Sequence, residues 1–354
     1  MINFINSLTD LWDRLRLADK PIVLYGMGNG ADKILDELES RNIAVKGIFA
    51  SDDFVRNKVF RGFQVKKYSD LKAEFKDMIV LVSFGTSRKE ILKRIYNIAR
   101  EQELYAPDVA VIGGGLFDKQ YAINHIEDIE KVYSMLSDDM SRHTFKKHIA
   151  YKITGDVFHL MACEIYNNPI ESSISPTFFN SDETFMDIGA YTGDTVLKFI
   201  ENVNGSYRHI YAIEPDRKNY EKALINTEEF ENITALNLCI SDKAEKIHFD
   251  MKKGRNSSIG NNGQLIDANS VDNILQGKIA TYIKFDVEGQ EQKAIIGAKN
   301  TIIEHKPKLK IAAYHRFDDL ITIPILLSTI RNDYKIYLRH TPQIPAWDTD
   351  YYFV

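Results

Sequence analysis

The sequence predicts an α/β protein in which two Rossmann-like, doubly wound sheets are joined by a helical connector. The chain has 354 residues, which is more than one hydrophobic core usually organises, so two domains are expected. A short apolar run, a glycine-rich turn and a helical pattern follow one another twice, at residues 21–38 and 184–200. Strand and helix patterns then alternate in both halves, and this order is typical of parallel βαβ units.

The same patterns set the expected domain boundaries. Residues 1–117 should form the first sheet domain, which begins with the first glycine turn. Residues 118–180 should form the helical connector, because apolar residues recur there mostly at helical spacing. Prolines among serines end this stretch, which favours a boundary before the second sheet domain at residues 181–354.

Composition excludes several classes of partner. The net charge is −5, and no run of basic residues is longer than two, so nucleic acid is not an expected partner. No apolar run approaches the roughly 20 residues that span a bilayer. Residues 1–20 resemble an amphipathic helix more than a signal peptide, so a cytoplasmic location is expected. Cys163 and Cys239 lie in apolar contexts and are expected to be reduced core thiols.

Carboxylates stand at three predicted strand ends of the second domain, at Asp187, Glu214 and Asp286. In a doubly wound sheet the ligand lies beyond the carboxyl ends of the strands. A pyrophosphate at the second glycine turn would be repelled by Asp187 and Asp194, whereas a sulfonium or ammonium group would be attracted. A carboxylate after the second strand can also accept both ribose hydroxyls. The alternative is that the turn only begins a helix, with Thr192 or Asp194 as its N-cap.

Residues 185–195, 211–216 and 283–291, followed by Gly297-Ala298, resemble the FkbM family of methyltransferases. The resemblance covers nearly all of residues 181–354. It implies a class I methyltransferase fold and an S-adenosylmethionine-dependent O-methyltransferase. The implied acceptor is a hydroxyl-bearing small molecule, such as a sugar, a nucleotide-linked sugar or a glycan precursor. The cofactor-binding residues expected from the motifs are Asp187, Gly189, Ala190, Tyr191, Thr192, Gly193, Asp194, Glu214, Pro215, Ser241 and Asp286.

A hydroxyl acceptor needs a general base, and the candidates are Asp286, Glu288 and His315. Two alternatives remain open: Glu288 could cap the helix that follows it, and His315 could be an ordinary hydrogen-bonded loop residue. Asp286 and Glu288 with a third carboxylate would also suit Mg²⁺. No Cys/His spacing predicts a metal site, so none is expected. The polar, glycine-rich residues 252–263 are either a lid over the acceptor or a solvated hairpin connection.

The first glycine turn carries Gly26, Gly28 and Gly30, and matches the dinucleotide pattern only approximately. Asp52 and Asp53 follow near the ribose-binding spacing. Together with later segments, this arrangement resembles the nucleotide-sugar-binding domains of bacterial sugar-modifying enzymes. A nucleotide-sugar pocket, an NAD-like site and an empty scaffold that makes homodimer contacts are the three interpretations.

Two rival functions follow from this first domain. The chain could be a non-catalytic nucleotide-binding regulator or scaffold. It could also be an NAD-dependent oxidoreductase that uses the first turn, although no Tyr-Lys or His-Asp pair stands near that turn. The acceptor pocket of a methyltransferase is built from variable loops, so the sequence does not name the acceptor.

Overall fold

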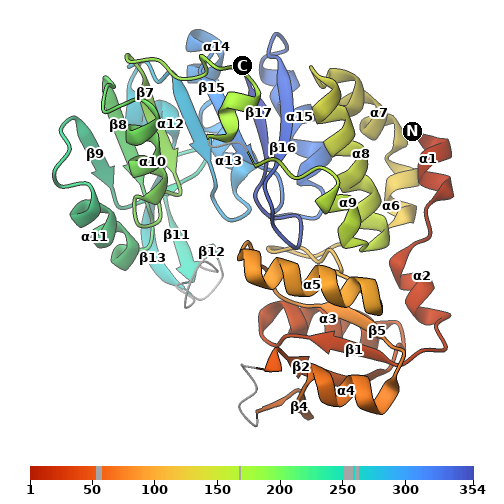
Figure 1. The fold of residues 1–354 in the computed structure, drawn as a ribbon. Helices are drawn as coiled ribbons and strands as arrows, with labels where there is room; N and C mark the ends of the chain where they lie inside the picture. Colours follow the sequence, from red (N-terminus) through yellow and green to blue (C-terminus); the bar gives the residue numbers. More distant parts are fainter. Residues whose placement is uncertain (53–57, 167–168, 251–257, 260–262) are drawn as a thin grey trace.

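The computed structural model describes residues 1–52, 58–166, 169–250, 258–259 and 263–354 (Figure 1). A small sheet domain at the N-terminus, a group of helices and a larger sheet domain make up the molecule. Both sheets are mainly parallel and covered by helices, so the predicted α/β class is confirmed. None of the described helices is long and apolar enough to cross a membrane.

The first sheet is parallel except for one short edge strand, β3. Its strand order is β3-β4-β2-β1-β5-β6. The strands are β1 (Ile22–Tyr25), β2 (Val45–Ala50), β3 (Val59–Phe60), β4 (Phe63–Lys67), β5 (Ile79–Val82) and β6 (Glu103–Tyr105). Its helices are α3 (Asn29–Ser40), α4 (Tyr68–Phe75) and α5 (Lys89–Glu101). Alternate residues of β1 enter two different cores, one with α3 and one with α4 and α5, so the sheet is covered on both faces.

The second sheet has the order β16-β17-β15-β14-β7-β8-β9, and β17 runs antiparallel to its neighbours. Its strands are β7 (Thr184–Ile188), β8 (His209–Ile213), β9 (Ile233–Leu236), β14 (Tyr282–Phe285), β15 (Lys308–Ala312), β16 (Ile336–His340) and β17 (Thr349–Phe353). Its helices are α10 (Asp194–Asn202), α11 (Arg217–Asn226), α12 (Val271–Leu275), α13 (Glu291–Ile296), α14 (Lys299–His305) and α15 (Asp319–Ile330). The carboxyl ends of β7, β8, β14 and β15 therefore meet at one edge.

A small sheet that the sequence patterns did not predict is formed by residues that follow β9 in the chain. It contains β10 (Cys239–Ile240), β11 (Glu245–Asp250), β12 (Ser258–Ile259) and β13 (Gln264–Asn269), in the order β10-β13-β11-β12. Most of the predicted lid or hairpin connection at residues 252–263 lies outside the described residues. Cys163 and Cys239 are free and buried, as expected.

The helical connector packs against the second sheet. Its helices are α6 (Lys119–Asn124), α7 (Ile126–Met135), α8 (Asp139–Thr154), α9 (Val157–Met161) and the 3-10 helix η2 (Ile170–Ser173). Phe117 and Phe145 share one hydrophobic core with Phe285 of β14. Arg339 of β16 is fully buried and bonds to Asp138 at 2.6 Å, which ties the start of α8 to the sheet.

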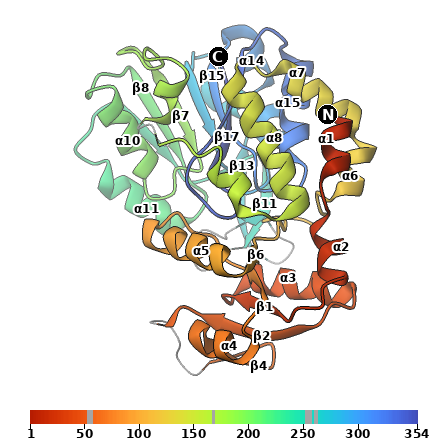
Figure 2. The same ribbon diagram turned by 45° about the vertical axis from the view of Figure 1, so that its right-hand side comes forward.

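The N-terminal segment differs from the single amphipathic helix that was expected. It forms two helices, α1 (Ile2–Ser7) and α2 (Leu11–Arg16), and Asp10 caps the second through its side chain. The two helices lie against different parts of the molecule (Figure 2). Ile5 of α1 belongs to the core of the second sheet, whereas Leu11 and Leu15 of α2 belong to the core of the first.

The first sheet domain touches two loops at the carboxyl edge of the second sheet. Thr86 and Ile344 exchange two backbone hydrogen bonds, and Trp347 packs so closely on Gly85 that a Cβ there would lie 2.0 Å from its ring. The other loop is held at Ile112, whose backbone N–H donates to the carbonyl oxygen of His315 at 2.9 Å.

Candidate functional site

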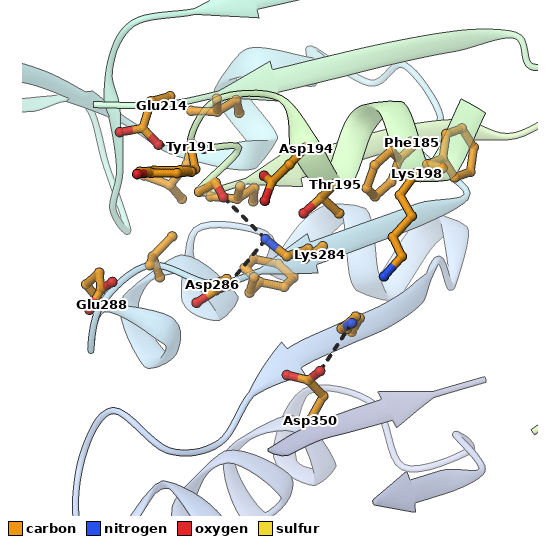
Figure 3. A pocket seen from close by; sticks show the side chains of 18 of the residues that line it. Phe185, Tyr191, Asp194, Thr195, Lys198, Glu214, Lys284, Asp286, Glu288 and Asp350 are labelled. Atoms are coloured by element: carbon orange, nitrogen blue, oxygen red, sulfur yellow. Dashed lines mark hydrogen bonds and ion pairs between the residues drawn. The ribbon is translucent and has the colours of Figure 1, made fainter. Parts of the chain in front are cut away.

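A cavity of about 610 Å³ opens at the carboxyl ends of β7, β8 and β14 and continues along the sheet face beneath α10 (Figure 3). This volume is typical of small-molecule sites. Its charged lining is mainly acidic and consists of Glu171, Asp194, Glu214, Asp286, Glu288, Asp348 and Asp350 with three lysines, Lys198, Lys284 and Lys310. The structure thus brings four of the predicted carboxylates, Asp194, Glu214, Asp286 and Glu288, to one cavity, whereas Asp187 does not line it.

The second glycine turn lies against the end of β14. A Cβ at Gly189 would lie 1.9 Å from the carbonyl oxygen of Asp286, and its φ is +86°, so only glycine fits there. Gly189 and Tyr191 line the cavity, whereas Ala190 is buried in the core. Gly193 is the N-cap of α10, so neither Thr192 nor Asp194 caps this helix as the alternative proposed. Asp194 lines the cavity, but Thr192 and Gly193 do not.

Glu214 stands directly after β8 at the cavity wall and is only 7% exposed. Its carboxylate accepts hydrogen bonds from the backbone N–H groups of Tyr191 and Asp216, at 2.8 and 2.9 Å. Burial raises the pKa of Glu214 to about 7, although these two amides oppose the rise. Glu214 therefore fixes the glycine turn and faces the cavity beside Pro215.

Asp187 is fully buried and is not one of the cavity-lining residues. The register of the sheet pairs it with Lys284 of β14, whose Nζ lies 3.1 Å from Asp187 Oδ1 and 3.5 Å from Asp286 Oδ2. Burial raises the pKa of Asp187, whereas Lys284 lowers it. The other oxygen of Asp187 has no hydrogen-bond partner among the described residues. A lysine that the motifs did not predict thus lies between two predicted carboxylates.

Ser241 does not line the cavity, unlike the residues just before it. It is buried and donates to Asp242 and Glu245 at 3.0 Å. The apolar wall beyond Glu214 is formed instead by Leu238, Cys239, Ile240 and Phe249.

His315 is 1% exposed and lies among three carboxylates. Its Nδ1 lies 2.8 Å from Glu291, and its Nε2 lies 3.6 Å from both Asp286 and Glu288. Burial alone would lower the pKa of His315, but Glu291 and the other two carboxylates raise it to about 10. Because the imidazole is then protonated at neutral pH, it cannot accept a proton. Its position favours a supporting role for His315 and leaves the role of base to a carboxylate.

Glu288 is the carboxylate best placed to act as a base. It lines the cavity with a side chain 29% exposed, and its backbone has a φ of +50°. Burial raises the pKa of Glu288 to about 7, although His315 opposes the rise. Glu288 does not cap the next helix. The N-cap of that helix, α13, is Gln290, whose side chain makes no capping hydrogen bond. The carboxylate of Glu291 accepts instead from the N–H groups of Val287 and Gly289 in the turn before the helix.

Asp286 is the other predicted carboxylate that lines the cavity. The hydroxyl of Tyr314 donates to it at 3.2 Å. Burial would raise the pKa of Asp286, but Lys284 and His315 hold it below the usual value. Asp286 therefore stays ionised and is a weaker base than Glu288. Among the described residues no group of three or more His, Cys, Asp or Glu side chains could hold a metal ion.

Sequence reasoning missed the inner end of the cavity. Its sheet side carries Tyr282, Lys284, Lys310 and Asp350, and Glu171 of η2 faces them. A signal was present in the sequence, because a central parallel strand is normally apolar throughout and β14 and β15 contain lysines.

The glycines of the first turn have structural roles in the first sheet domain. Gly26 and Gly28 have φ values of +111° and +117°, and a Cβ at Gly30 would lie 2.3 Å from the carbonyl oxygen of Ser83. Asp52 accepts a hydrogen bond from the backbone of Tyr68, and Asp53 lies outside the described residues. Ligand binding at this turn stays a prediction.

Two family models match separate parts of this chain. Residues 187–336 match the model of the methyltransferase FkbM domain, and residues 18–104 match that of the C2185-like, N-terminal domain. The solved structure of methyltransferase FkbM from Methylobacillus flagellatus KT is similar over 95% of this chain and 90% of its own. Its TM-score is 0.72 and its sequence identity is 22%, so it shows a shared fold.

Two other solved structures are similar over about half of this chain. Precorrin-6y C5,15-methyltransferase from Geobacter metallireducens GS-15 has a TM-score of 0.34 and 11% identity, over 53% of this chain and 88% of its own. Aeropyrum pernix fibrillarin in complex with S-adenosyl-L-methionine has a TM-score of 0.31 and 12% identity, over 49% and 68%. No curated protein matches the chain.

Proposed function

Since residues 187–336 form a methyltransferase FkbM domain with a class I methyltransferase-like fold, we propose that the protein is an S-adenosylmethionine-dependent O-methyltransferase. Its acceptor is a hydroxyl of a small molecule, such as a sugar, a nucleotide-linked sugar or a glycan precursor. The observation that carries the proposal is the acid-lined cavity at the second glycine turn, with Glu214 after the second strand.

The residues of this cavity fit S-adenosylmethionine. Glu214 offers a carboxylate to the ribose hydroxyls. Leu238, Ile240 and Phe249 offer an apolar wall to the adenine. Asp194 and Asp286 suit the positively charged sulfonium and ammonium groups. A pyrophosphate would meet these same acids, and the lysine beside the turn, Lys284, is already paired with Asp187 and Asp286, which disfavours a dinucleotide.

When bound, S-adenosylmethionine supplies a methyl group on a positively charged sulfur. An electrophile of this kind needs mainly alignment and exclusion of water from the protein. Glu288 takes the proton from the acceptor hydroxyl, because its pKa of about 7 lets it accept a proton at neutral pH. His315 and Glu291 hold the loop that carries Glu288.

Calorimetric titration with S-adenosylhomocysteine and with NADH tests this function. The wild-type protein should bind S-adenosylhomocysteine and show no heat with NADH. Glu214→Gln should weaken binding by at least about tenfold, since a charge-assisted hydrogen bond contributes about 1.5–3 kcal/mol. Glu221→Gln, an exposed change on α11, is the matched control. Binding of NADH instead of S-adenosylhomocysteine by the wild-type protein would overturn the proposal whatever the variants do.

A further inference from the structure

Most of the α10 residues that line the cavity are polar, although this helix covers a sheet; Phe199 is the apolar exception. Val196, Phe199 and Ile200 of α10 enter the hydrophobic core, as expected for such a helix. Thr195 and Lys198, however, line the inner end of the cavity together with Asn202 at the end of the helix. Figure 3 shows the Lys198 side chain extending from α10 into the cavity, on the side where Asp350 lies.

The polar groups of these three α10 side chains are available to a ligand. Within the described parts of the chain, no hydrogen bond or ion pair engages the side chains of Thr195, Lys198 or Asn202. The other two lysines of the cavity are both paired: Lys284 with Asp187, and Lys310 with Asp350 at 3.2 Å. Lys198 thus differs from them as an exposed cation at the cavity that has no partner among the described residues.

The acids at the inner end are already engaged by other groups. Lys310 lies between Asp350 and Glu171, and the hydroxyl of Tyr282 also donates to Glu171 at 3.3 Å. Asp194 is one helical turn before Lys198 and makes no ion pair with it. The α10 wall therefore offers hydrogen-bond donors, one of them charged, to whatever occupies this end. A ligand rich in acceptor oxygens matches such a wall.

We propose that the inner end of the cavity is the acceptor subsite and that Lys198 binds a carboxylate or phosphate group of the acceptor. The acceptor is then a hydroxylated anion rather than a neutral molecule, with Thr195 and Asn202 bonded to its oxygens. This inference rests on the proposed function, because it assigns the end of the cavity at Glu214 to S-adenosylmethionine. The acceptor must then reach from Lys198 to Glu288, which lies on the Glu214 side of the cavity (Figure 3).

Titration of the full chain, saturated with S-adenosylhomocysteine, tests the subsite with three probes. The probes are glucose 6-phosphate, glucuronate and glucose, at constant ionic strength. At least one anionic probe should bind at least about tenfold more tightly than glucose, and the stronger of the two identifies phosphate or carboxylate as the group. Lys198→Gln should remove this preference, and Lys198→Arg should retain most of it. Lys222→Gln, an exposed lysine on α11 outside the cavity lining, should change nothing.

Two outcomes would overturn the subsite. If Lys198 only balances the charge of Glu171 and Asp350, glucose will bind as tightly as the anionic probes. If the anions bind elsewhere, Lys198→Gln will bind them like the wild-type protein. Failure of S-adenosylhomocysteine itself to bind would refute the proposed function and is seen before any probe is added.

Discussion

Replacement of the buried histidine by glutamine, His315→Gln, should destabilise the protein and make its stability less dependent on pH. A pKa that rises from 6.5 to about 10 on folding corresponds to about 5 kcal/mol in favour of the folded, protonated form. Loss of one partner from a buried ion pair typically costs about 3–5 kcal/mol, because the other charge is left buried. The two estimates of the lost free energy of unfolding are therefore of the same order.

The sign of the pH dependence follows from the direction of this shift. The contribution of His315 is fully present below pH 6.5 and is lost as the pH rises toward about 10. Urea unfolding at pH 6, 8 and 10 measures it as the difference between wild type and variant, which should shrink steadily with pH. His143→Gln, at an exposed histidine of α8, is the control. A difference that stays constant with pH would refute the idea that His315 is a buried cation.

Two further changes test the site and a third tests the contact between Gly85 and Trp347. Glu288→Gln should lower kcat by about 10²-fold or more and leave S-adenosylhomocysteine binding intact. Wild-type activity should rise with pH through a midpoint of about 7. An unaltered kcat in the variant would exclude Glu288 as the base. Gly189→Ala should abolish S-adenosylhomocysteine binding in calorimetry, because its Cβ would meet a backbone oxygen. The control Gly205→Ala, where φ is also positive but the space around the Cβ is free, should bind normally. Gly85→Ala should displace Trp347 and move tryptophan emission to longer wavelength; an unshifted spectrum would argue against the close packing.

The sequence predicted the parts of the site that depend on local patterns. Gly189 and Glu214 each follow a short apolar strand, and parallel strands bring their carboxyl ends to one edge. That reasoning placed Asp286 and Glu288 correctly at the cavity as well. The motif alone could not show which of its residues line the cavity and which support it from the core. Ala190, within the same turn, is buried in the core.

The rest of the site depends on contacts between residues distant in the chain. The pairing of Lys284 with Asp187 joins residues 97 positions apart through the sheet register. The charge of His315 depends on Glu291, which belongs to α13 and lies 24 residues earlier in the chain. The antiparallel β17 was not predicted either, because its burial results from its place between two other strands.

The contacts of Gly85 and Ile112 with the larger sheet limit how this protein can be recombined with its relatives. A chimera that exchanges only residues 18–104 would graft a foreign surface beneath Trp347 and disturb the loop that carries Asp348 to the cavity. A transplant that includes residues 341–348 with the donor sheet would keep the two surfaces matched. The crossover points of such hybrids are therefore determined by the contacts of Gly85 with Trp347 and of Ile112 with His315, rather than by the ends of the first sheet.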